Sequence, residues 1–180
     1  MAKNKLRFKS KWLKVYETPT GFFFAERKGI DSVAFILIDS ERDQIGLVSE
    51  GKEPVGNIKM ITAFGGSIDD VDKRQDQKYL LETVIKEVEE EAGFYVKPKD
   101  VIYCGKVLCS TQMNQFVHLF TVHVKRDEQK EKTSKDPREF SSFVSWLKPE
   151  QLTILEDWKA ITIYFKYRVW LVTQNRKVSK

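Results

Sequence analysis

The sequence predicts an α+β fold, and three observations support that prediction. Apolar runs of strand length recur in residues 12–69, 101–124 and 140–147. An amphipathic helix is expected between about residues 77 and 92, and a second helix with a broad apolar face follows the last run. The order of strands, one helix, strands and one helix is typical of an α+β or sandwich plan.

The composition is that of an ordinary globular protein. The chain has 180 residues, of which 41% are hydrophobic and 32% are charged, and this balance excludes an intrinsically disordered class. There are 31 basic and 26 acidic residues, a formal net charge of +5. Six of the basic residues fall in the first fourteen positions, with no acid among them. That pattern suits contact with nucleic acid or an anionic surface, although a solvated terminus is its commoner meaning.

Cysteine usage and hydropathy bear on the compartment. Cys104 and Cys109 are the only cysteines in the sequence, and they match neither a zinc motif nor a disulfide framework. We expect both to be core or near-core thiols in a reducing compartment. No apolar run approaches the roughly 18 residues needed to span a bilayer, and no signal peptide precedes the fold. The sequence therefore predicts a cytoplasmic protein without a membrane segment.

The first half of the chain is expected to consist of hairpins. Two β-rich pieces within residues 12–27 flank a Pro-Thr-Gly turn, which predicts an N-terminal β-hairpin. Residues 31–39 form a run typical of a buried strand, and residues 44–50 should be its antiparallel partner. Residues 59–69 are expected to form a short strand that breaks at the glycine pair Gly65-Gly66.

The second half begins with the amphipathic helix, from about Gln77 to Ala92. Its apolar stripe has a period of 3.6 and consists of Leu81, Val84, Ile85, Val88 and Ala92. Gly93 is placed to cap the helix. Strands follow at 101–110 and 116–124, then a polar loop at 126–139 that is long enough to be functional or mobile, a last strand at 140–147, and the C-terminal helix. His118 and His123 lie five apart on one strand, on opposite faces, which argues against a shared metal site.

Four glutamates crowd the end of the first helix: Glu87, Glu89, Glu90 and Glu91. At about 100° per residue, Glu87, Glu90 and Glu91 share one face and Glu89 points away. Like charges repel there, and the helix dipole makes them still less favourable. Acid-rich helix ends also occur on solvated surfaces, but the upstream glycine pair and the capping glycine favour a metal site. Carboxylates one turn apart on a rigid helix suit Mg²⁺.

At this point the sequence resembles a known family. GGSIDD followed by KEVEEEAGF is similar to the Nudix box of the Nudix hydrolases, G-x5-E-x7-R-E-U-x-E-E-x-G-U, where U is bulky and apolar. Residues 86–94 match the second half of that pattern, except that Lys86 replaces arginine. The flanking segments resemble the branch that hydrolyses ADP-ribose and nucleoside-diphosphate sugars, over most of the chain.

Two departures from the pattern affect the interpretation. About six extra residues lie between Ser67 and Ile85, so the acid that replaces the first family glutamate stays open among four aspartates, Asp69, Asp70, Asp72 and Asp76. Lys86 offers a point charge where the family has a guanidinium fork.

The resemblance implies a Nudix fold, with a mixed β-sheet sandwiched between helices and an N-terminal β-hairpin. Residues 1–180 would form a single domain in which residues 1–30 are an extension that forms a homodimer. The implied reaction is a Mg²⁺-dependent hydrolysis, with Mn²⁺ as a substitute, of the diphosphate in ADP-ribose or a related nucleoside-diphosphate sugar. The products would be a nucleoside monophosphate and a sugar phosphate.

The resemblance also assigns roles to residues of this sequence. The implied metal ligands are the Gly65 carbonyl, Glu87, Glu90 and Glu91. Glu139 is the first choice for the general base, and Glu128 and Glu131 in the same loop compete with it. The candidate substrate-binding residues are Phe24, Arg27, Lys52 and Gly66. Simpler roles compete for these: hairpin packing or a dimer interface for Phe24, a solvated charge for Arg27 and a plain turn for Gly66.

Two other interpretations stay open. The branch usually carries glutamine-x-arginine where this chain has Glu50-Gly51-Lys52. The substrate could therefore instead be a dinucleoside polyphosphate, a nucleoside triphosphate, or capped or triphosphate RNA. Of these, RNA is not favoured. A nucleotide-sensing module that does not cleave is the third interpretation. The retention of three mutually repelling acids favours catalysis.

Overall fold

The computed structural model describes residues 3–28, 31–137 and 140–178. The ten strands in the described part of the chain are β1 (Lys5–Lys9), β2 (Leu13–Glu17), β3 (Phe23–Arg27), β4 (Ser32–Asp39), β5 (Gln44–Lys52), β6 (Ile58–Thr62), β7 (Phe64–Ser67), β8 (Val101–Ser110), β9 (Met113–His123) and β10 (Phe143–Leu147). The helices are α1 (Gln77–Glu87) and α2 (Trp158–Val178), and a π-helical turn (Val88–Ala92) extends α1. Short 3₁₀ turns lie at Glu53–Val55, Val71–Lys73, Pro98–Asp100, Arg126–Glu128 and Pro149–Ile154.

All ten strands belong to one mixed sheet, in the order β1-β2-β3-β9-β4-β5-β10. Three more strands pair off this path, β6 with β5, β7 with β4 and β8 with β9. The β4–β9 pair at the centre is parallel, from Ser32 opposite Val117 to Ile38 opposite His123. The expected hairpin of β4 with β5 is confirmed, and the expected last strand is β10, which pairs with β5.

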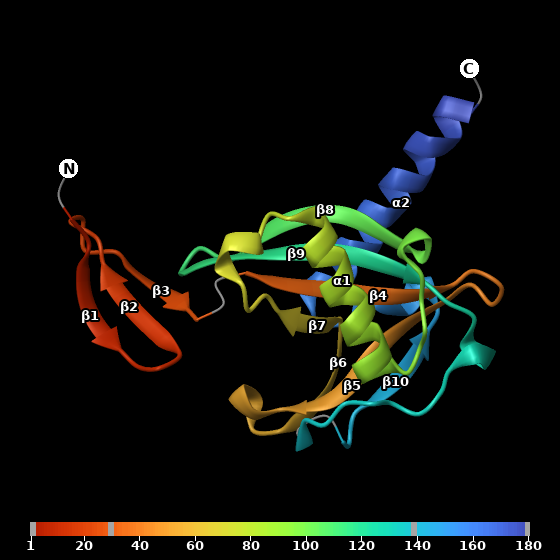
Figure 1. The fold of residues 1–180 in the computed structure, drawn as a ribbon, viewed down its shortest axis with the longest axis horizontal. Helices are drawn as coiled ribbons and strands as arrows, with labels where there is room; N and C mark the ends of the chain where they lie inside the picture. Colours follow the sequence, from red (N-terminus) through yellow and green to blue (C-terminus); the bar gives the residue numbers. More distant parts are fainter. Residues whose placement is uncertain (1–2, 29–30, 138–139, 179–180) are drawn as a thin grey trace.

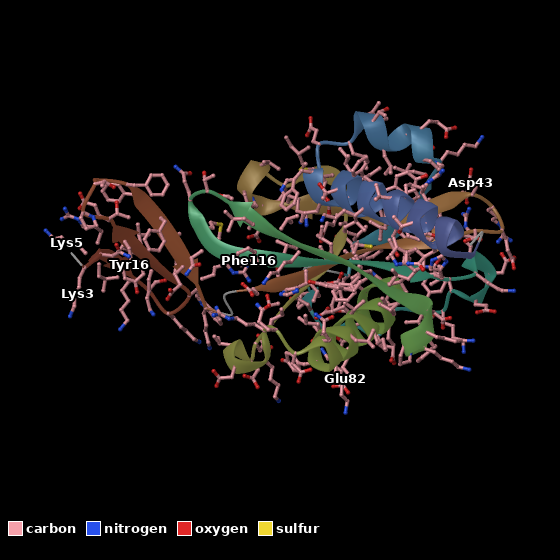
Figure 2. The ribbon with its side chains drawn as sticks, turned by 90° about the horizontal axis from the view of Figure 1, so that it is seen from above. Lys3, Lys5, Tyr16, Asp43, Glu82 and Phe116 are labelled. Atoms are coloured by element: carbon pink, nitrogen blue, oxygen red, sulfur yellow. The ribbon has the colours of Figure 1, made fainter. Side chains whose placement is uncertain are left out.

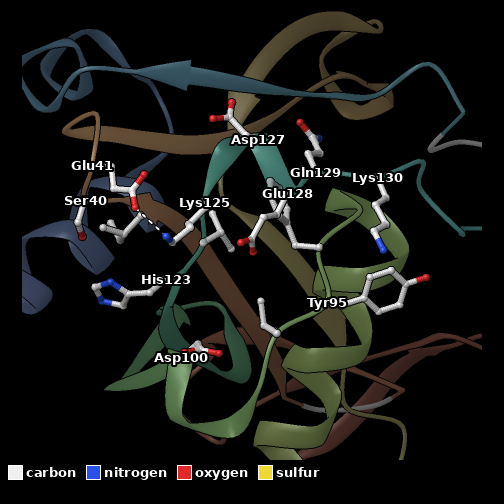
Figure 3. A pocket seen from close by; sticks show the side chains of 14 residues that line it. Ser40, Glu41, Tyr95, Asp100, His123, Lys125, Asp127, Glu128, Gln129 and Lys130 are labelled. Carbon is white, nitrogen blue, oxygen red and sulfur yellow. Dashed lines mark ion pairs between the residues drawn. The ribbon is translucent and has the colours of Figure 1, made fainter.

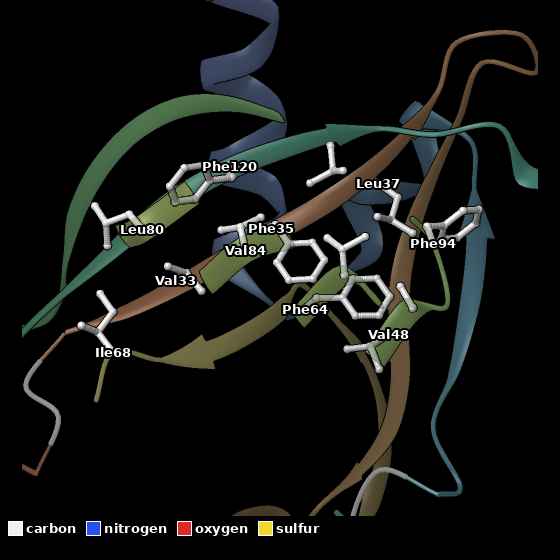
Figure 4. Close-up of a cluster of buried hydrophobic side chains, with 13 residues drawn as sticks. Val33, Phe35, Leu37, Val48, Phe64, Ile68, Leu80, Val84, Phe94 and Phe120 are labelled. Carbon is white, nitrogen blue, oxygen red and sulfur yellow. The ribbon is translucent and has the colours of Figure 1, made fainter. Parts of the chain in front are cut away.

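Strand β4 is buried on both faces, which is why it reads as a continuous apolar run. Its alternate residues Val33, Phe35 and Leu37 contribute to the core under α1, with the Phe35 and Phe64 rings stacked 5.1 Å apart between centroids (Figure 4). The intervening Ala34, Ile36 and Ile38 face α2. The predicted arrangement of a sheet between helices is confirmed (Figure 1).

The residues around α1 explain where it begins and which face it buries. Asp76 caps the N-terminus by accepting hydrogen bonds from the backbone N–H groups of Lys78 (2.9 Å) and Tyr79 (3.3 Å). The buried stripe runs through Leu80, Val84, Val88 and Ala92. The expected position Leu81 is wrong as a core residue, because it lies one residue round the helix and is only half-buried.

Two further expectations need correction. The glycine pair does not end a strand: residues 58–67 form the two strands β6 and β7, and Gly65 and Gly66 lie inside β7. The N-terminal hairpin of β2 and β3 is confirmed, but β1 adds a third strand to it. Figure 1 shows these three strands at one end of the molecule, projecting from the rest of the sheet; we call residues 3–28 the N-terminal lobe.

Both cysteines are free thiols and half-buried, as expected for near-core residues. In the described part of the chain no helix is both long and apolar enough to cross a membrane.

Candidate active site

The acidic helix end departs from a regular α-helix. After Glu87 the residues Val88–Ala92 adopt a π-helical turn, and Gly93 closes it in the left-handed region at φ 74°. The predicted α-helix up to Ala92 is therefore wrong in its last turn, while the capping role of Gly93 is confirmed. Single π turns are rare and are frequently found at functional sites.

Gly66 brings the sheet against this helix end. It pairs with Val33 in the middle of the β4–β7 ladder. A β-carbon at Gly66 would lie 2.6 Å from both Cγ and Cδ of Glu87 and nearer still to Oε1. The absence of a side chain at this position is what lets the Glu87 carboxylate lie over the strand.

A cleft runs along the sheet beside these residues. It consists of two hollows of about 230 Å³ and 710 Å³, which share Glu50, Lys52, Gly65 and Glu91. The smaller hollow also includes Gly66, Ser67 and Lys159. The larger one continues past Lys59 to Pro137 and Ser141. The structure thus brings the predicted Lys52, Gly65, Gly66 and Glu91 together.

The cleft combines carboxylates with several cations. Lys52 forms an ion pair with Glu50 from the same strand. The Lys59 ammonium lies 4.3 Å from the ring centroid of Phe143, and Lys159 enters from the first turn of α2, 3.9 Å from Asp157. Ammonium groups beside acidic metal ligands suit a phosphate chain that carries more charge than the metal alone neutralises.

Glu90 is paired with a lysine one helical turn before it. The Lys86 ammonium donates to Glu90 Oε2 at 2.8 Å, an i,i+4 pair across the π turn. The pKa of Lys86 is raised chiefly by this hydrogen bond, with weaker contributions from the charges of Glu87 and Asp69. In the position where the resemblance leads us to expect an arginine fork, a lysine therefore forms a hydrogen bond with Glu90 and acts on Glu87 through its charge.

The polar loop after β9 covers the π turn. The Gln129 side-chain amide donates to the Ala92 carbonyl at 3.0 Å, and the backbone N–H groups of Lys130 and Ser134 donate to the carbonyls of Gly93 (2.8 Å) and Glu90 (3.1 Å). These bonds supply partners for carbonyl groups at the helix end. They also fix the course of the loop toward the cleft.

The three candidates for the general base lie in or just after this loop, and the structure separates them. Glu139 lies outside the described residues; Pro137 and Ser141, on either side of it in the chain, line the cleft. Glu131 is exposed. Glu128 lines a different hollow.

That hollow, of about 680 Å³, opens between the ends of β4 and β9 and the segment after the π turn. Figure 3 shows it, with the Lys125–Glu41 ion pair at 2.9 Å on one side and Tyr95 on the other. It contains none of the predicted site residues except the alternative base Glu128. The candidate active site is therefore the cleft beside Gly65 and Gly66.

Two predicted substrate-binding residues lie in or beside the N-terminal lobe. Arg27 donates to the Ser67 hydroxyl at 3.0 Å, and Ser67 itself lines the cleft. Phe24 stacks on Tyr16, with ring centroids 5.3 Å apart, and lines neither hollow of the cleft. Within one copy of the chain, the structure brings Arg27 to the margin of the cleft and leaves Phe24 in the lobe.

The structure also narrows the choice of the aspartate that replaces the first glutamate of the Nudix box pattern. Asp76 is the cap of α1, and Asp70 accepts from the Asp72 N–H at 3.1 Å while it pairs with Lys73 at 3.2 Å. Asp69 is the candidate whose charge acts on Lys86. The choice therefore narrows to Asp69 and Asp72, and neither of them lines the two hollows of the cleft.

The sequence prediction missed several residues of the site. Glu50 and Lys159 line the cleft. Buried Asp157 accepts a hydrogen bond from the Ala63 N–H at 2.7 Å, and it caps α2 by accepting another from the Ala160 N–H at 3.4 Å. An acid just before an apolar helix is a capping signal, so Asp157 could have been found from the sequence. Glu50 stands where the family branch has glutamine, so the resemblance could have pointed to it, whereas nothing in the sequence pattern points to Lys159.

The donors beside the cleft can be compared with what a metal ion needs. Over residues 3–28, 31–137 and 140–178, no three His, Cys, Asp or Glu side chains are grouped so as to hold a metal ion. Two carboxylates remain as donors. Glu87 lies against Gly66, and Glu91 lines the hollow that Gly66 also lines. Mg²⁺ typically binds one or two carboxylates and completes its shell with water and substrate phosphates, so the donors fit this ion, with Glu90 outside the pair.

Comparison with known proteins agrees with this architecture. A family model described as NUDIX domain matches residues 30–168. Among solved structures, the crystal structure of an ADP compounds hydrolase has a TM-score of 0.66 and 17% sequence identity, over 97% of this chain and 94% of that chain. At that identity the likeness shows the fold alone. A search of curated proteins gave no match.

Proposed function

This chain belongs to the Nudix hydrolase family, and from that premise we propose that it hydrolyses the diphosphate of ADP-ribose or a related nucleoside-diphosphate sugar. The products are a nucleoside monophosphate and a sugar phosphate. The observation that carries the proposal is the cleft in which Glu91, Gly65, Gly66, Lys52 and other ammonium groups meet, with Glu87 packed against Gly66 at its side. The ADP compounds hydrolase with the same fold supports this class of substrate.

We assign the metal site to Glu87, Glu91 and the carbonyl of Gly65. Mg²⁺, or Mn²⁺ in its place, would supply positive charge to offset the charge that develops on the phosphate oxygens. Glu90 is the proposed third ligand; Lys86 donates to its Oε2, so its Oε1 can still bind a metal ion. Its present hydrogen bond holds Lys86 at the acidic helix end.

The other side chains bind the substrate and handle protons. Lys52, Lys59 and Lys159 bind the phosphate oxygens, and the bare backbone at Gly66 allows those oxygens to approach closely. Glu139 is the proposed general base, which removes a proton from the attacking water; the position of Pro137 and Ser141 in the cleft supports this choice.

Arg27 is proposed to bind the part of the substrate that is attached to the nucleoside diphosphate, because its hydrogen bond to Ser67 holds it at the margin of the cleft. Phe24 stacks on a substrate base only if a second copy brings it there. A homodimer formed through the N-terminal lobe is therefore part of the proposal, and the exposed apolar residues of that lobe support it: Leu6, Phe8, Phe22 and Phe23. A cytoplasmic location is proposed from the two free thiols.

The test is product analysis after incubation with Mg²⁺ and a panel of substrates. The panel holds ADP-ribose, ADP- and UDP-glucose, diadenosine polyphosphates, nucleoside triphosphates and 5′-triphosphate RNA. We expect AMP and ribose 5-phosphate from ADP-ribose, a loss of at least about 100-fold in Glu91→Gln, and no change in Glu82→Gln. Glu82 is a matched control, because it is an exposed glutamate of α1 outside the cleft.

The other outcomes separate the alternatives. Turnover of a different panel member alone would keep the chemistry and replace the substrate. No turnover of any member, together with tight metal-free nucleotide binding in a calorimeter, would refute hydrolysis and favour a sensor.

A further inference from the structure

The positive charge of this protein is concentrated in the N-terminal lobe. Residues 3–28 contain eight of the 31 basic residues and two of the 26 acidic ones, a formal charge of +6. The whole chain has +5, so all the rest of the sequence together carries −1. Figure 2 shows that this lobe stands apart from the body, with Lys3 and Lys5 at its far end. A compact domain close to neutral therefore carries a strongly cationic appendage.

A groove lies where the lobe meets the body. It consists of two hollows of about 390 Å³ and 710 Å³ that share Trp12, Leu13, Arg27 and Lys28. Five cations line it: Lys9, Lys11, Lys14, Arg27 and Lys28. Two acids accompany them, Glu26, which is paired with Lys14 at 3.1 Å, and Asp69. The groove thus has a net excess of positive charge along its whole length.

An aromatic ring stands in this groove without apolar cover. Trp12 is 60% exposed, and the ammonium groups of Lys11 and Lys28 lie 4.8 Å and 5.2 Å from its ring centroid. The turn that presents it is ordered, because Ser10 Oγ accepts from the N–H groups of Trp12 (3.2 Å) and Leu13 (2.9 Å). A fixed, exposed indole flanked by cations is the arrangement on which an unpaired base stacks while its phosphates are neutralised.

The groove is continuous with the candidate active site. Ser67 lines both the larger hollow of the groove and the smaller hollow of the cleft, and Arg27 hydrogen-bonds to Ser67 from the lobe side. The next residue back along β7 is Gly66, which lies against Glu87. A polyanionic strand in the groove would therefore have one end beside the acids.

We propose that this groove binds single-stranded nucleic acid, with Trp12 stacking on a base, Lys11 and Lys28 contacting phosphates, and a 5′-phosphorylated end directed toward the cleft. A second copy of the chain fits the groove less well, because the exposed apolar residues of the lobe that support the proposed homodimer (Leu6, Phe8, Phe22 and Phe23) do not line it. The binding itself is independent of the proposed hydrolysis, whereas the direction of the 5′ end rests on it. A strand of roughly 4–16 nucleotides covers one such site in other single-strand binders.

The experiment measures binding without turnover. An oligonucleotide of roughly 12 nucleotides, labelled at its 3′ end, is titrated with the full chain in the presence of EDTA, and anisotropy is followed from about 50 to 300 mM salt. RNA and DNA of the same sequence form separate arms. Each is used with a 5′-hydroxyl and with a 5′-triphosphate end.

We expect the affinity to fall linearly with salt on logarithmic axes, with a slope near −0.7 for each phosphate contacted. Trp12→Ala should weaken binding about tenfold and leave the slope unchanged. The double variant Lys11→Gln/Lys28→Gln should reduce the slope by about 1.4. The matched control is Lys78→Gln/Lys99→Gln, which removes two exposed lysines from the body and should behave as the wild type.

Absence of binding at the lowest salt, or equal losses in the groove and control variants, would refute the proposal. So would a dimer in sedimentation that Trp12→Ala dissociates, because the ring would then cover another copy. Glu91→Gln should bind the oligonucleotide normally while it loses turnover. Failure of ADP-ribose hydrolysis with oligonucleotide binding intact would thus refute the proposed function and leave this inference in place. The two 5′ ends are compared in Glu91→Gln with Mg²⁺ in place of EDTA, because without a metal ion the acids of the cleft repel a triphosphate. A 5′-triphosphate that binds no tighter than a 5′-hydroxyl there would refute the assigned direction of the strand.

Discussion

Replacing Gly66 by alanine tests the site geometry most directly. The new β-carbon would lie 2.6 Å from Cδ of Glu87, and an ordinary contact needs about 3.4 Å. The carboxylate must therefore retreat by about 0.8 Å. Cγ of Glu87 lies at the same 2.6 Å, so the side chain must turn away from the strand from its Cβ onward and not only at the carboxylate.

The expected result is a separation of stability from activity. Alanine in a strand costs no more than glycine, so the free energy of unfolding should change by less than about 1 kcal/mol. A displacement near 1 Å of a metal-ligating carboxylate should reduce kcat/KM about 100-fold. Higher Mg²⁺ should restore part of the loss, since the displaced ligand weakens metal binding.

The assay compares kcat/KM for ADP-ribose over a Mg²⁺ series with the melting temperature of the same preparations. Gly65→Ala is the matched control, because its nearest clash is milder, at 3.1 Å from the Val33 carbonyl oxygen, and it keeps its own carbonyl. We expect it to lose less than about tenfold. Full activity in a folded Gly66→Ala protein would show that Glu87 need not occupy its observed position, and the assignment of the metal site would be wrong.

Three more predictions concern the surrounding residues. Lys86→Met should lower the free energy of unfolding by less than about 1 kcal/mol, since an exposed i,i+4 pair contributes little. It should nevertheless change the Mg²⁺ dependence of turnover, because Glu90 is released. An unchanged Mg²⁺ titration would refute the connection between Lys86 and the metal site. Asp157→Ala should destabilise by about 2 kcal/mol in urea unfolding, because a buried backbone donor and a helix cap lose their acceptor; a loss below about 0.5 kcal/mol would contradict it. Burial lowers the pKa of both His118 and His123. Below about pH 6.5 the unfolded chain therefore binds more protons than the folded chain, and the free energy of unfolding should fall as the pH falls. The decrease should be at most about 1.4 kcal/mol per pH unit for each histidine. His123→Phe should reduce that slope, and an identical slope would show that His123 does not cause it.

Much of the central architecture could be predicted from the sequence because local signals agree with the fold. Residues 33–38 are all apolar because both faces of β4 are covered. The capping Gly93 was recognisable from its place after the apolar stripe. Lys52 and Glu91 were singled out, and both line the cleft.

The remaining features depend on contacts between distant segments. The π turn forms where Gln129, Lys130 and Ser134 donate to the helix end, and no local pattern encodes those partners. Lys159 reaches the cleft only because Asp157 ties α2 to Ala63, 94 residues earlier in the chain.

The central parallel pair of the sheet also affects how the chain is made. Ser32 pairs with Val117, so β4 lacks this neighbour until 85 more residues have left the ribosome. At about 5–20 residues per second, that interval is about 4–17 seconds. During it the segment SVAFILID has its hairpin partner β5 on one side and an open edge on the other. Synthesis thus exposes an apolar strand edge in every nascent copy, and chaperone supply or translation speed should control the yield of folded protein.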